Sequence, residues 1–329
     1  MTPVRSALSL LAASSILTPA SIAQTFLGPD PYLSEADKPA GFLMGSHVVE
    51  TFEDLSLDYG LTVNIGAPIP PSPNVDSVDG DDGVIDGSGN GGASFFGFGP
   101  VTFTFPAPVK EAGIVWTDAA AFASVTFEAF GPGMVSLGVH GPFMHADGSN
   151  GGETAEDRFY GIQDPNGIVA IEIRCGGNQS FEVDHVQFPT LGTSYCSPAP
   201  NSTGETGIQT VMGSRRVADN EVTLVASRLP LNAFGYFLTS TTQGFVANAG
   251  GSQGNLCLGG AVGRFNAGIF NTGANGHGIL PIDLTAIPTP TGATAIQAGE
   301  TWHFQAWHRD SFGGTTTSNF TDAVSVTFG

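Results

Sequence analysis

Short runs in which apolar and polar residues alternate recur along most of the chain. Val101–Phe105 (Val-Thr-Phe-Thr-Phe) and Ser124–Phe130 alternate strictly, which places successive side chains on opposite faces of an extended strand. Further β-branched and aromatic runs, bounded by Gly, Pro, Asn or Asp, are Ala112–Thr117, Val135–Val139, Gly167–Ile173, Phe181–Phe188, Glu221–Ala226, Ala233–Thr239, Ile279–Leu284, Thr301–Arg309 and Ala323–Phe328. Few windows keep a helical period for more than about ten residues. The pattern predicts an all-β protein of sandwich or barrel type.

A break in this pattern at Pro189–Pro200 predicts a domain boundary. Residues 24–190 and 191–329 are each long enough to bury a core of their own. Turn signals such as Gly131-Pro-Gly133 and Asp164-Pro-Asn-Gly167 separate several of the expected strands. No internal repeat of fixed period is found, which argues against propellers and solenoids. We therefore expect two tandem β-sandwich domains.

The first 23 residues have the pattern of a secretory signal peptide. Arg5 supplies a positive charge, Ala7–Leu17 is apolar, and Ser21-Ile22-Ala23 resembles a cleavage site, so the mature chain would begin at Gln24. No later stretch approaches the roughly 20 consecutive apolar residues of a membrane span. These features predict a secreted, extracellular protein without a membrane span.

Negative charge is concentrated in the first predicted domain. Residues 24–190 contain 23 acidic and four basic residues, a net charge of −19, whereas residues 191–329 contain seven acids and five arginines, a net charge of −2. Because a polyanion would be repelled, the first domain is not expected to bind nucleic acid or an anionic membrane. Divalent cations and neutral glycans remain compatible with this charge.

Three cysteines occur in the chain, which in an oxidising compartment leaves one disulfide and one free thiol. Cys196 and Cys257 both lie in the second domain and Cys175 in the first, so we predict a Cys196–Cys257 disulfide. Closing a loop of that size would stabilise the fold by about 4 kcal/mol on the chain-entropy model.

The stretch Asp76–Gly92 combines acidic residues with glycines. Its carboxylates are Asp76, Asp79, Asp81, Asp82 and Asp86, and no Lys or Arg occurs between Lys38 and Lys110. Calcium prefers carboxylate and carbonyl oxygens, and glycines let a backbone turn tightly around an ion. The match to an EF-hand loop is partial, because Gly83 replaces a third ligand and no Glu closes the loop. The stretch therefore indicates either a calcium site or a solvated acidic turn.

A second group of acids lies beside the expected strands. Glu153, Glu156, Asp157 and Asp184 would converge with the long loop on one or two structural ions if the domain were a jelly roll. The alternative is that these acids form ion pairs with Arg158 or Arg174. Asp184 and His185 are neighbours on a strand, so their side chains are expected to lie on opposite faces.

Several separated motifs occur in an order that resembles a known type of domain. They are Asp76–Gly87, Gly113–Asp118 (Gly-Ile-Val-Trp-Thr-Asp), Phe127–Pro132, Glu153–Phe159 (Glu-Thr-Ala-Glu-Asp-Arg-Phe) and Glu182–Phe188 (Glu-Val-Asp-His-Val-Gln-Phe). Together they resemble a jelly-roll-like domain of bacterial secreted proteins that carry exosortase-type (PEP-CTERM) sorting tails. The resemblance covers most of Phe52–Phe188 and implies export and a jelly-roll-like sandwich, not an activity. The tail itself, with its Pro-Glu-Pro motif, is not expected here, because the sequence ends in a strand pattern.

The second domain resembles a C-terminal module of secreted proteins from planctomycete-like bacteria. The resemblance rests on Tyr195-Cys196, Phe234–Ser240, Gly250–Gly260 and Gly299–Asp310. It implies an extracellular accessory module without an assigned function.

The predicted strand Thr301–Arg309 offers a candidate ligand-binding face. Trp302, Phe304, Ala306 and His308 would face a core, leaving His303, Gln305, Trp307 and Arg309 on the other side. An indole among hydrogen-bonding groups suits sugar stacking, although a buried Trp with satisfied neighbours has the same pattern. No catalytic residues are predicted, because no nucleophile and base occur together in a recognisable motif.

We interpret the sequence as a secreted, non-catalytic binding or structural module, stabilised by calcium and binding a neutral or cationic glycan or a cell-envelope polymer. A secreted carbohydrate-active enzyme and a purely structural envelope protein are the alternatives.

Overall fold

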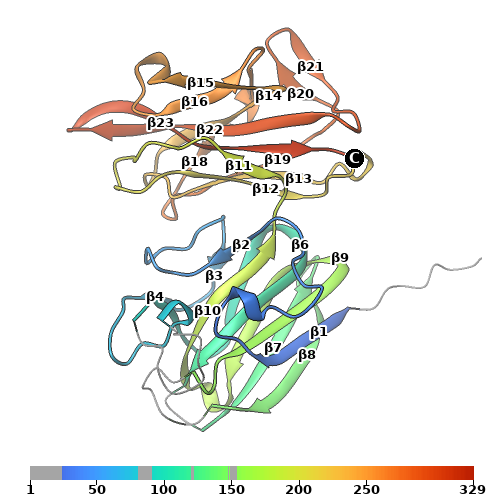
Figure 1. Ribbon diagram of the computed structural model, residues 1–329, viewed down its shortest axis with the longest axis vertical. Coiled ribbons are helices and arrows are strands. Elements are labelled where there is room, and N and C mark those ends of the chain that lie inside the picture. Colours follow the sequence, from blue (N-terminus) through green and yellow to red (C-terminus); the bar gives the residue numbers. More distant parts are fainter. Residues whose placement is uncertain (1–23, 81–90, 120–121, 147, 149–153) are drawn as a thin grey trace, which may run out of the picture.

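The computed structural model describes residues 24–80, 91–119, 122–146, 148 and 154–329. Within them the chain is built from β-strands and single turns of 3-10 helix, which confirms the predicted all-β sandwich class (Figure 1). All strand pairs formed by the described residues are antiparallel. The proposed signal peptide, residues 1–23, lies outside the described residues.

The first domain contains one ten-stranded sheet. Its strands are β1 (Thr25–Pro31), β2 (His47–Glu50), β3 (Thr62–Val63), β4 (Ala67–Ile69), β5 (Ser94–Phe98), β6 (Val101–Asp118), β7 (Ser124–Gly131), β8 (Val135–Met144), β9 (Arg158–Cys175) and β10 (Ser180–Pro189). The 3-10 turns are η1 (Glu35–Asp37), η2 (Val78–Gly80) and η3 (Gly176–Asn178). The sheet order is β4-β5-β10-β6-β9-β7-β8. In addition, β1 pairs with β9, β2 pairs with β10 and β3 pairs with β6.

Two long strands carry this sheet from one layer of the sandwich to the other. β9 pairs with β1 through Arg158–Gln163 and with β7 through Ala170–Cys175, while β6 follows it along both halves. The β6–β9 register shifts between Thr104 and Glu111, where Pro106 and Pro108 interrupt the ladder. Asp164-Pro-Asn-Gly167, expected as a turn between strands, is instead an irregular segment inside β9.

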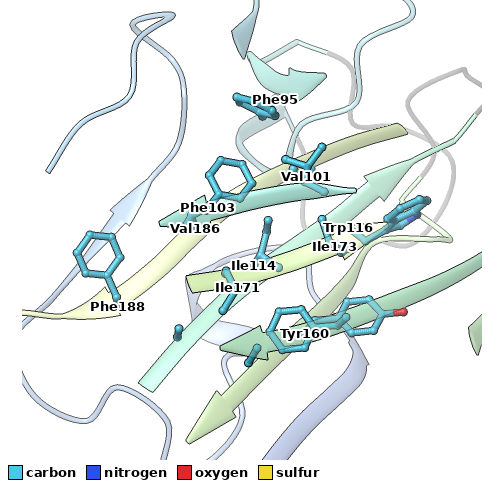
Figure 2. Close-up of a cluster of buried hydrophobic side chains, with 14 of the residues drawn as sticks. Phe95, Val101, Phe103, Ile114, Trp116, Tyr160, Ile171, Ile173, Val186 and Phe188 are labelled. Atoms are coloured by element: carbon cyan, nitrogen blue, oxygen red, sulfur yellow. The ribbon is translucent and has the colours of Figure 1, made fainter. Parts of the chain in front are cut away.

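The core of the first domain lies between these layers. Figure 2 shows part of it, with Phe103, Ile114, Trp116, Tyr160 and Phe188 turned into one cluster. These side chains are completely buried and come from β6, β9 and β10. A smaller cluster of Tyr32, Phe42, Leu43, Val78, Val115 and Phe159 packs on the opposite face of β6 and β9, beneath the N-terminal segment. Both faces of the central strands are therefore covered.

The second domain is a sandwich of two further sheets. Its strands are β11 (Thr193–Tyr195), β12 (Ile208–Gly213), β13 (Val222–Ser227), β14 (Phe234–Ser240), β15 (Thr242–Ala247), β16 (Asn255–Gly259), β17 (Gly263–Arg264), β18 (Phe270–Asn271), β19 (Gly278–Ile282), β20 (Ile287–Thr289), β21 (Gly292–Thr294), β22 (Thr301–Phe312) and β23 (Thr315–Thr327), with 3-10 turns η4 (Val217–Asp219), η5 (Ala249–Gly251) and η6 (Asn266–Gly268). The sheet β11-β23-β22-β14-β17, with β18 beside β14, packs on β12-β13-β19. Phe237, Trp302 and Phe304 lie in the core between them.

The two domains are packed against each other rather than merely linked. Met212 and Val225 of the second domain belong to the hydrophobic cluster of the first. The ring of His277 bonds to the carbonyl of Leu57 at 2.7 Å, and Arg228 forms ion pairs with Asp54 and Asp58. Figure 1 shows β12 and β13 on the side of the second domain that faces the first, with β15 and β16 on the far side.

The predicted disulfide is confirmed. Cys196 and Cys257 are bonded, with their Cα atoms 6.3 Å apart, and the bond ties β16 to the segment that follows β11. Cys175 is free and buried, and burial raises the pKa of its thiol to about 11.

Candidate functional site

Buried carboxylates gather at one end of the first domain. Asp118 ends β6 and pairs with Glu182 of β10, and Asp184 of the same strand pairs with Val115. Asp76, in the loop before η2, is joined to Glu182 because its backbone N–H donates to Glu182 Oε2 at 3.0 Å. At most 7% of any of these acidic residues is exposed. We call Asp76, Asp79, Asp118, Glu182, Asp184 and His185 the acidic centre.

Hydrogen bonds from the loop hold the two β10 carboxylates in place. Asp184 Oδ2 accepts from Ser77 Oγ at 3.1 Å and from the backbone N–H of Val78 at 3.0 Å. Glu182 Oε2, which accepts from the N–H of Asp76 in the loop, also accepts from Ser94 Oγ of β5 at 2.6 Å. Such bonds to a carboxylate are stronger than bonds between neutral groups. The loop is therefore positioned by the very groups that make the centre acidic.

His185 lies beside Asp184 rather than across the strand from it, contrary to the alternation expected from sequence. Its φ is +48°, and the β10–β6 register shifts between Asp184 and Gln187, so the strand bulges here. Its Nε2 lies 3.2 Å from Asp79 Oδ1 and its Nδ1 lies 3.3 Å from the hydroxyl of Tyr32. Ligand atoms of Asp79, Asp184 and His185 all lie within 4.8 Å of one another.

Burial shapes the electrostatics of this centre. It raises the pKa of Asp184 to about 7 and raises that of Glu182, because the charged carboxylates are removed from water. Burial alone would lower the pKa of His185, but the charge of Asp184 and the hydrogen bond to Asp79 outweigh it and the pKa is raised. A bound cation would lower the carboxylate pKa values again.

The other predicted metal ligands divide into two groups. Glu156 and Asp157 are buried just before β9, and the backbone carbonyl of Asp157 accepts from Tyr32 N at 3.3 Å. Asp81, Asp82, Asp86 and Glu153 lie outside the described residues. Arg174, the alternative partner for these acids, pairs among the described residues with Glu128 and Glu172. Arg158 donates to the backbone carbonyl of Asp157 at 2.7 Å.

The predicted ligand-binding face of β22 is half covered by the β15–β16 hairpin. Gln305 is completely buried; its amide donates to the carbonyls of Asn255 and Thr321 and accepts from the N–H of Cys257. His303 is 6% exposed and bonds to Ser325 Oγ at 2.7 Å. Contrary to the expectation from sequence, neither side chain is available to a ligand, because Gln305 bonds to the hairpin and His303 bonds to the neighbouring strand β23.

The other half of this face carries aromatic rings. Trp307 pairs directly with Tyr236 of β14, and their rings stack with centroids 4.9 Å apart. The Arg309 guanidinium carbon lies 5.9 Å from the centre of the Trp307 ring. Phe234, two residues before Tyr236 on β14, is 57% exposed. We call Phe234, Tyr236, Trp307 and Arg309 the aromatic surface.

Sequence reasoning missed several members of both sites. Asp118, Glu182 and His185 were not assigned as ligands, although each lies in a motif quoted above. Tyr236 and Phe234 were not assigned because pairing between β14 and β22 is set by the tertiary fold. The alternation in Phe234-Gly-Tyr236 was the available signal.

A groove of about 890 Å³ lies between the domains. Its lining includes Pro106, Pro108, Pro165 and Pro281. One of its carboxylates is already engaged: Glu111 accepts from the N–H of Leu43 at 2.8 Å and from Gln163 at 2.6 Å. Another, Asp164, accepts twice from Asn166. These engaged acids make the groove a weaker candidate than the aromatic surface.

Comparisons with known proteins place the chain in no family. No family model and no curated protein matches it. A β-glucuronidase of Parabacteroides merdae, solved with glycerol in its active site, aligns with 92% of this chain and 34% of its own length at 9% identity. Its TM-score of 0.14 carries no argument about fold or function. In the described part of the chain, no helix is long and apolar enough to cross a membrane.

Proposed function

We propose that this protein is an exported, non-catalytic glycan-binding protein whose first domain is stabilised by calcium. The observation that carries the binding function is the aromatic surface, where a half-buried Tyr236–Trp307 pair, packed on the cluster of Leu238, Leu258 and Phe320, lies beside an exposed Phe234. Rings presented in this way suit the apolar faces of sugars, and neighbouring polar groups bond to hydroxyls. The Cys196–Cys257 disulfide supports the export part of the proposal, because such bonds persist in oxidising compartments.

Replacing Phe234 by Ala tests the binding function. Because the ring is 57% exposed, its removal should weaken binding to immobilised polysaccharides about tenfold and leave the melting temperature unchanged. Phe98→Ala is a matched control, since Phe98 is equally exposed on β5 of the other domain. A glycan array on the unmodified protein comes first: no binding to any sugar would favour the structural-protein alternative. Release of reducing ends from a bound polysaccharide would instead favour the enzyme.

Calcium is proposed for the acidic centre because its donors are mainly carboxylates, all of them buried except the exposed Asp79. Asp79 and Asp184, whose ligand atoms lie within 4.8 Å of each other, would supply hard oxygen ligands of the kind that calcium prefers, and Asp76 and Glu182 add further buried carboxylates to the same centre. His185 adds a nitrogen, which is a ligand more typical of transition metals. Elemental analysis of the purified protein therefore has to distinguish calcium from zinc or manganese.

Removal of calcium should lower the stability of the first domain. A single ion present at a hundred times its dissociation constant adds about 2.7 kcal/mol, so EDTA should lower the melting temperature and calcium should restore it. Asp184→Asn should abolish this response, whereas Asp30→Asn, at an exposed position of β1, should preserve it. An EDTA-insensitive melting curve together with no metal in the elemental analysis would refute the calcium proposal.

A further inference from the structure

The aromatic surface includes one arginine, Arg309, and a second arginine, Arg264, lies beside it. Arg309 lies on the same face of β22 as Trp307 and is exposed. Arg264 of β17 pairs directly with Leu238 of β14, so it shares the face of Leu238 and Tyr236 and lies diagonally beside Tyr236. Within the described part of the chain, neither guanidinium forms a hydrogen bond or an ion pair, and that of Arg309 lies over the Trp307 ring. Both charges are therefore available to a ligand.

Among the described residues, the strands and the hairpin on this side of the sheet present no carboxylate. The segment 240–263, which contains the covering hairpin, has no charged residue. Asp310, the neighbour of Arg309, is 7% exposed and accepts from Ser202 N at 2.9 Å and from Asn319 Nδ2 at 3.3 Å, which directs it to the other face. The surface is thus locally positive in a chain with a net charge of −20.

The strongly acidic first domain does not cancel this local charge. Figure 1 shows the hairpin side of the β22 sheet turned away from the first domain. Charges separated by more than about 8 Å of physiological salt solution are largely screened. The expectation of a neutral or cationic sugar, which rested on the charge of the first domain, therefore does not apply to this surface.

The spacing of the arginines sets the size of the ligand. Arg264 and Arg309 lie two strands apart, which is about 10 Å across the sheet. Leu238 pairs with Arg264 on one side and with Gln305 on the other, so Arg309 lies four residues, or about 13 Å, further along the strand direction. A ligand that reaches both must extend over several sugar units, with one ring stacked between them on Tyr236 and Trp307. Arginine binds carboxylate and sulfate oxygens in a bidentate manner.

We propose that the aromatic surface binds an anionic oligosaccharide, with Arg264 and Arg309 each contacting an acidic group of the sugar chain. This inference rests on the proposed glycan-binding function and specifies its ligand. The shared chemistry is a pyranose chain with regularly spaced negative charge, carried either by carboxylates or by sulfates.

Calorimetric titration of the full chain with matched oligosaccharides tests the proposal. The probes are an oligogalacturonate, a sulfated galactan fragment, a neutral galactan fragment of the same length and a single-stranded DNA of equal charge. At least one acidic sugar should bind tenfold or more tighter than the neutral one, and its affinity should fall as salt is raised. Whichever acidic sugar binds with the higher affinity shows whether the ligand's negative groups are carboxylates or sulfates.

Charge-removing variants connect this preference to the two side chains. Arg264→Gln and Arg309→Gln should each reduce affinity for the acidic sugar about fivefold to tenfold and leave neutral-sugar affinity unchanged. Arg216→Gln is the control, because its side chain is 76% exposed and lies away from this face. Equal affinity for acidic and neutral sugars would overturn the inference while preserving glycan binding. Absence of binding to every sugar would overturn both, and DNA binding as tight as the best sugar would replace the glycan by a nucleic acid.

Discussion

Asp322 is a buried carboxylate whose charge opposes folding near neutral pH. Burial raises its pKa from an ordinary 3.8 to about 6, against the hydrogen bonds from Ser194 Oγ and the N–H of Gln209. The folded state therefore holds the carboxyl proton of Asp322 more tightly than the unfolded state does. The contribution of this group to the free energy of unfolding is complete below pH 3.8 and is lost as the pH rises through 6. The loss amounts to at most about 3 kcal/mol.

Asp322→Asn should therefore stabilise the protein above pH 6 and have little effect near pH 4. The amide can keep both bonds, since its oxygen accepts from Gln209 and its NH2 group donates to Ser194 Oγ. Urea unfolding between pH 4 and 8 should show a flatter stability profile for this variant. Glu221→Gln, at an exposed position, is the control and should leave the profile unchanged. A variant less stable than the parent at pH 8 would contradict the assignment.

Single residues also mark where sequence reasoning was insufficient. The alternation rule separates Asp184 from His185, but a positive φ at His185 and the adjacent bulge bring their ligand atoms together. The alternation along β22 placed the Gln305 side chain on the face opposite the main core, where it was expected to be open to a ligand. It is buried because a hairpin from a different part of the chain bonds to it.

At the scale of elements, the β15–β16 hairpin depends on its covalent tether. Cys257 lies on β16 and is completely buried, and its partner Cys196 follows β11. The loop spans 61 residues, so removing the bond should destabilise the second domain by about 4 kcal/mol on the chain-entropy model.

The measurement is thermal unfolding of the Cys196→Ser/Cys257→Ser variant beside the parent protein. Non-reducing peptide mapping of the parent should recover the two cysteine peptides linked. Cys175→Ser serves as control, because that thiol is free, and it should leave the peptide map unchanged. A linkage of Cys175 to either partner, or equal melting temperatures with and without the bond, would contradict the prediction.

At the scale of the whole molecule, Arg228 joins the two domains. Its guanidinium lies 2.5 Å from Asp58 and 3.0 Å from Asp54 of the first domain, and Asp58 is 1% exposed. Arg228→Gln would leave the Asp58 carboxylate buried without its counter-charge, and should cost about 3 kcal/mol at pH 7. Adding Asp58→Asn to this variant should restore part of the lost stability, because the uncompensated carboxylate is then removed.

Urea unfolding of the single and double variants measures this coupling. Arg216→Gln, which removes an arginine at an exposed position, should change stability by less than about 0.5 kcal/mol. Because Met212 and Val225 extend the core of the first domain, the parent should unfold in one transition. A loss no larger for Arg228→Gln than for Arg216→Gln would show that the ion pairs do not hold the junction.

The sequence by itself determined the all-β class, most strand positions, and the Cys196–Cys257 pair, because these depend on local alternation, turn residues and cysteine placement. It also singled out Asp76 and Asp184 as candidate ligands, and both carboxylates are buried in the first domain. Only the tertiary structure decided which of these side chains meet. The shift of register in β10 sets the position of His185, and the pairing of β14 with β22 brings Tyr236 to Trp307. Contacts of this kind join segments distant in sequence, and no local pattern of residues specifies them.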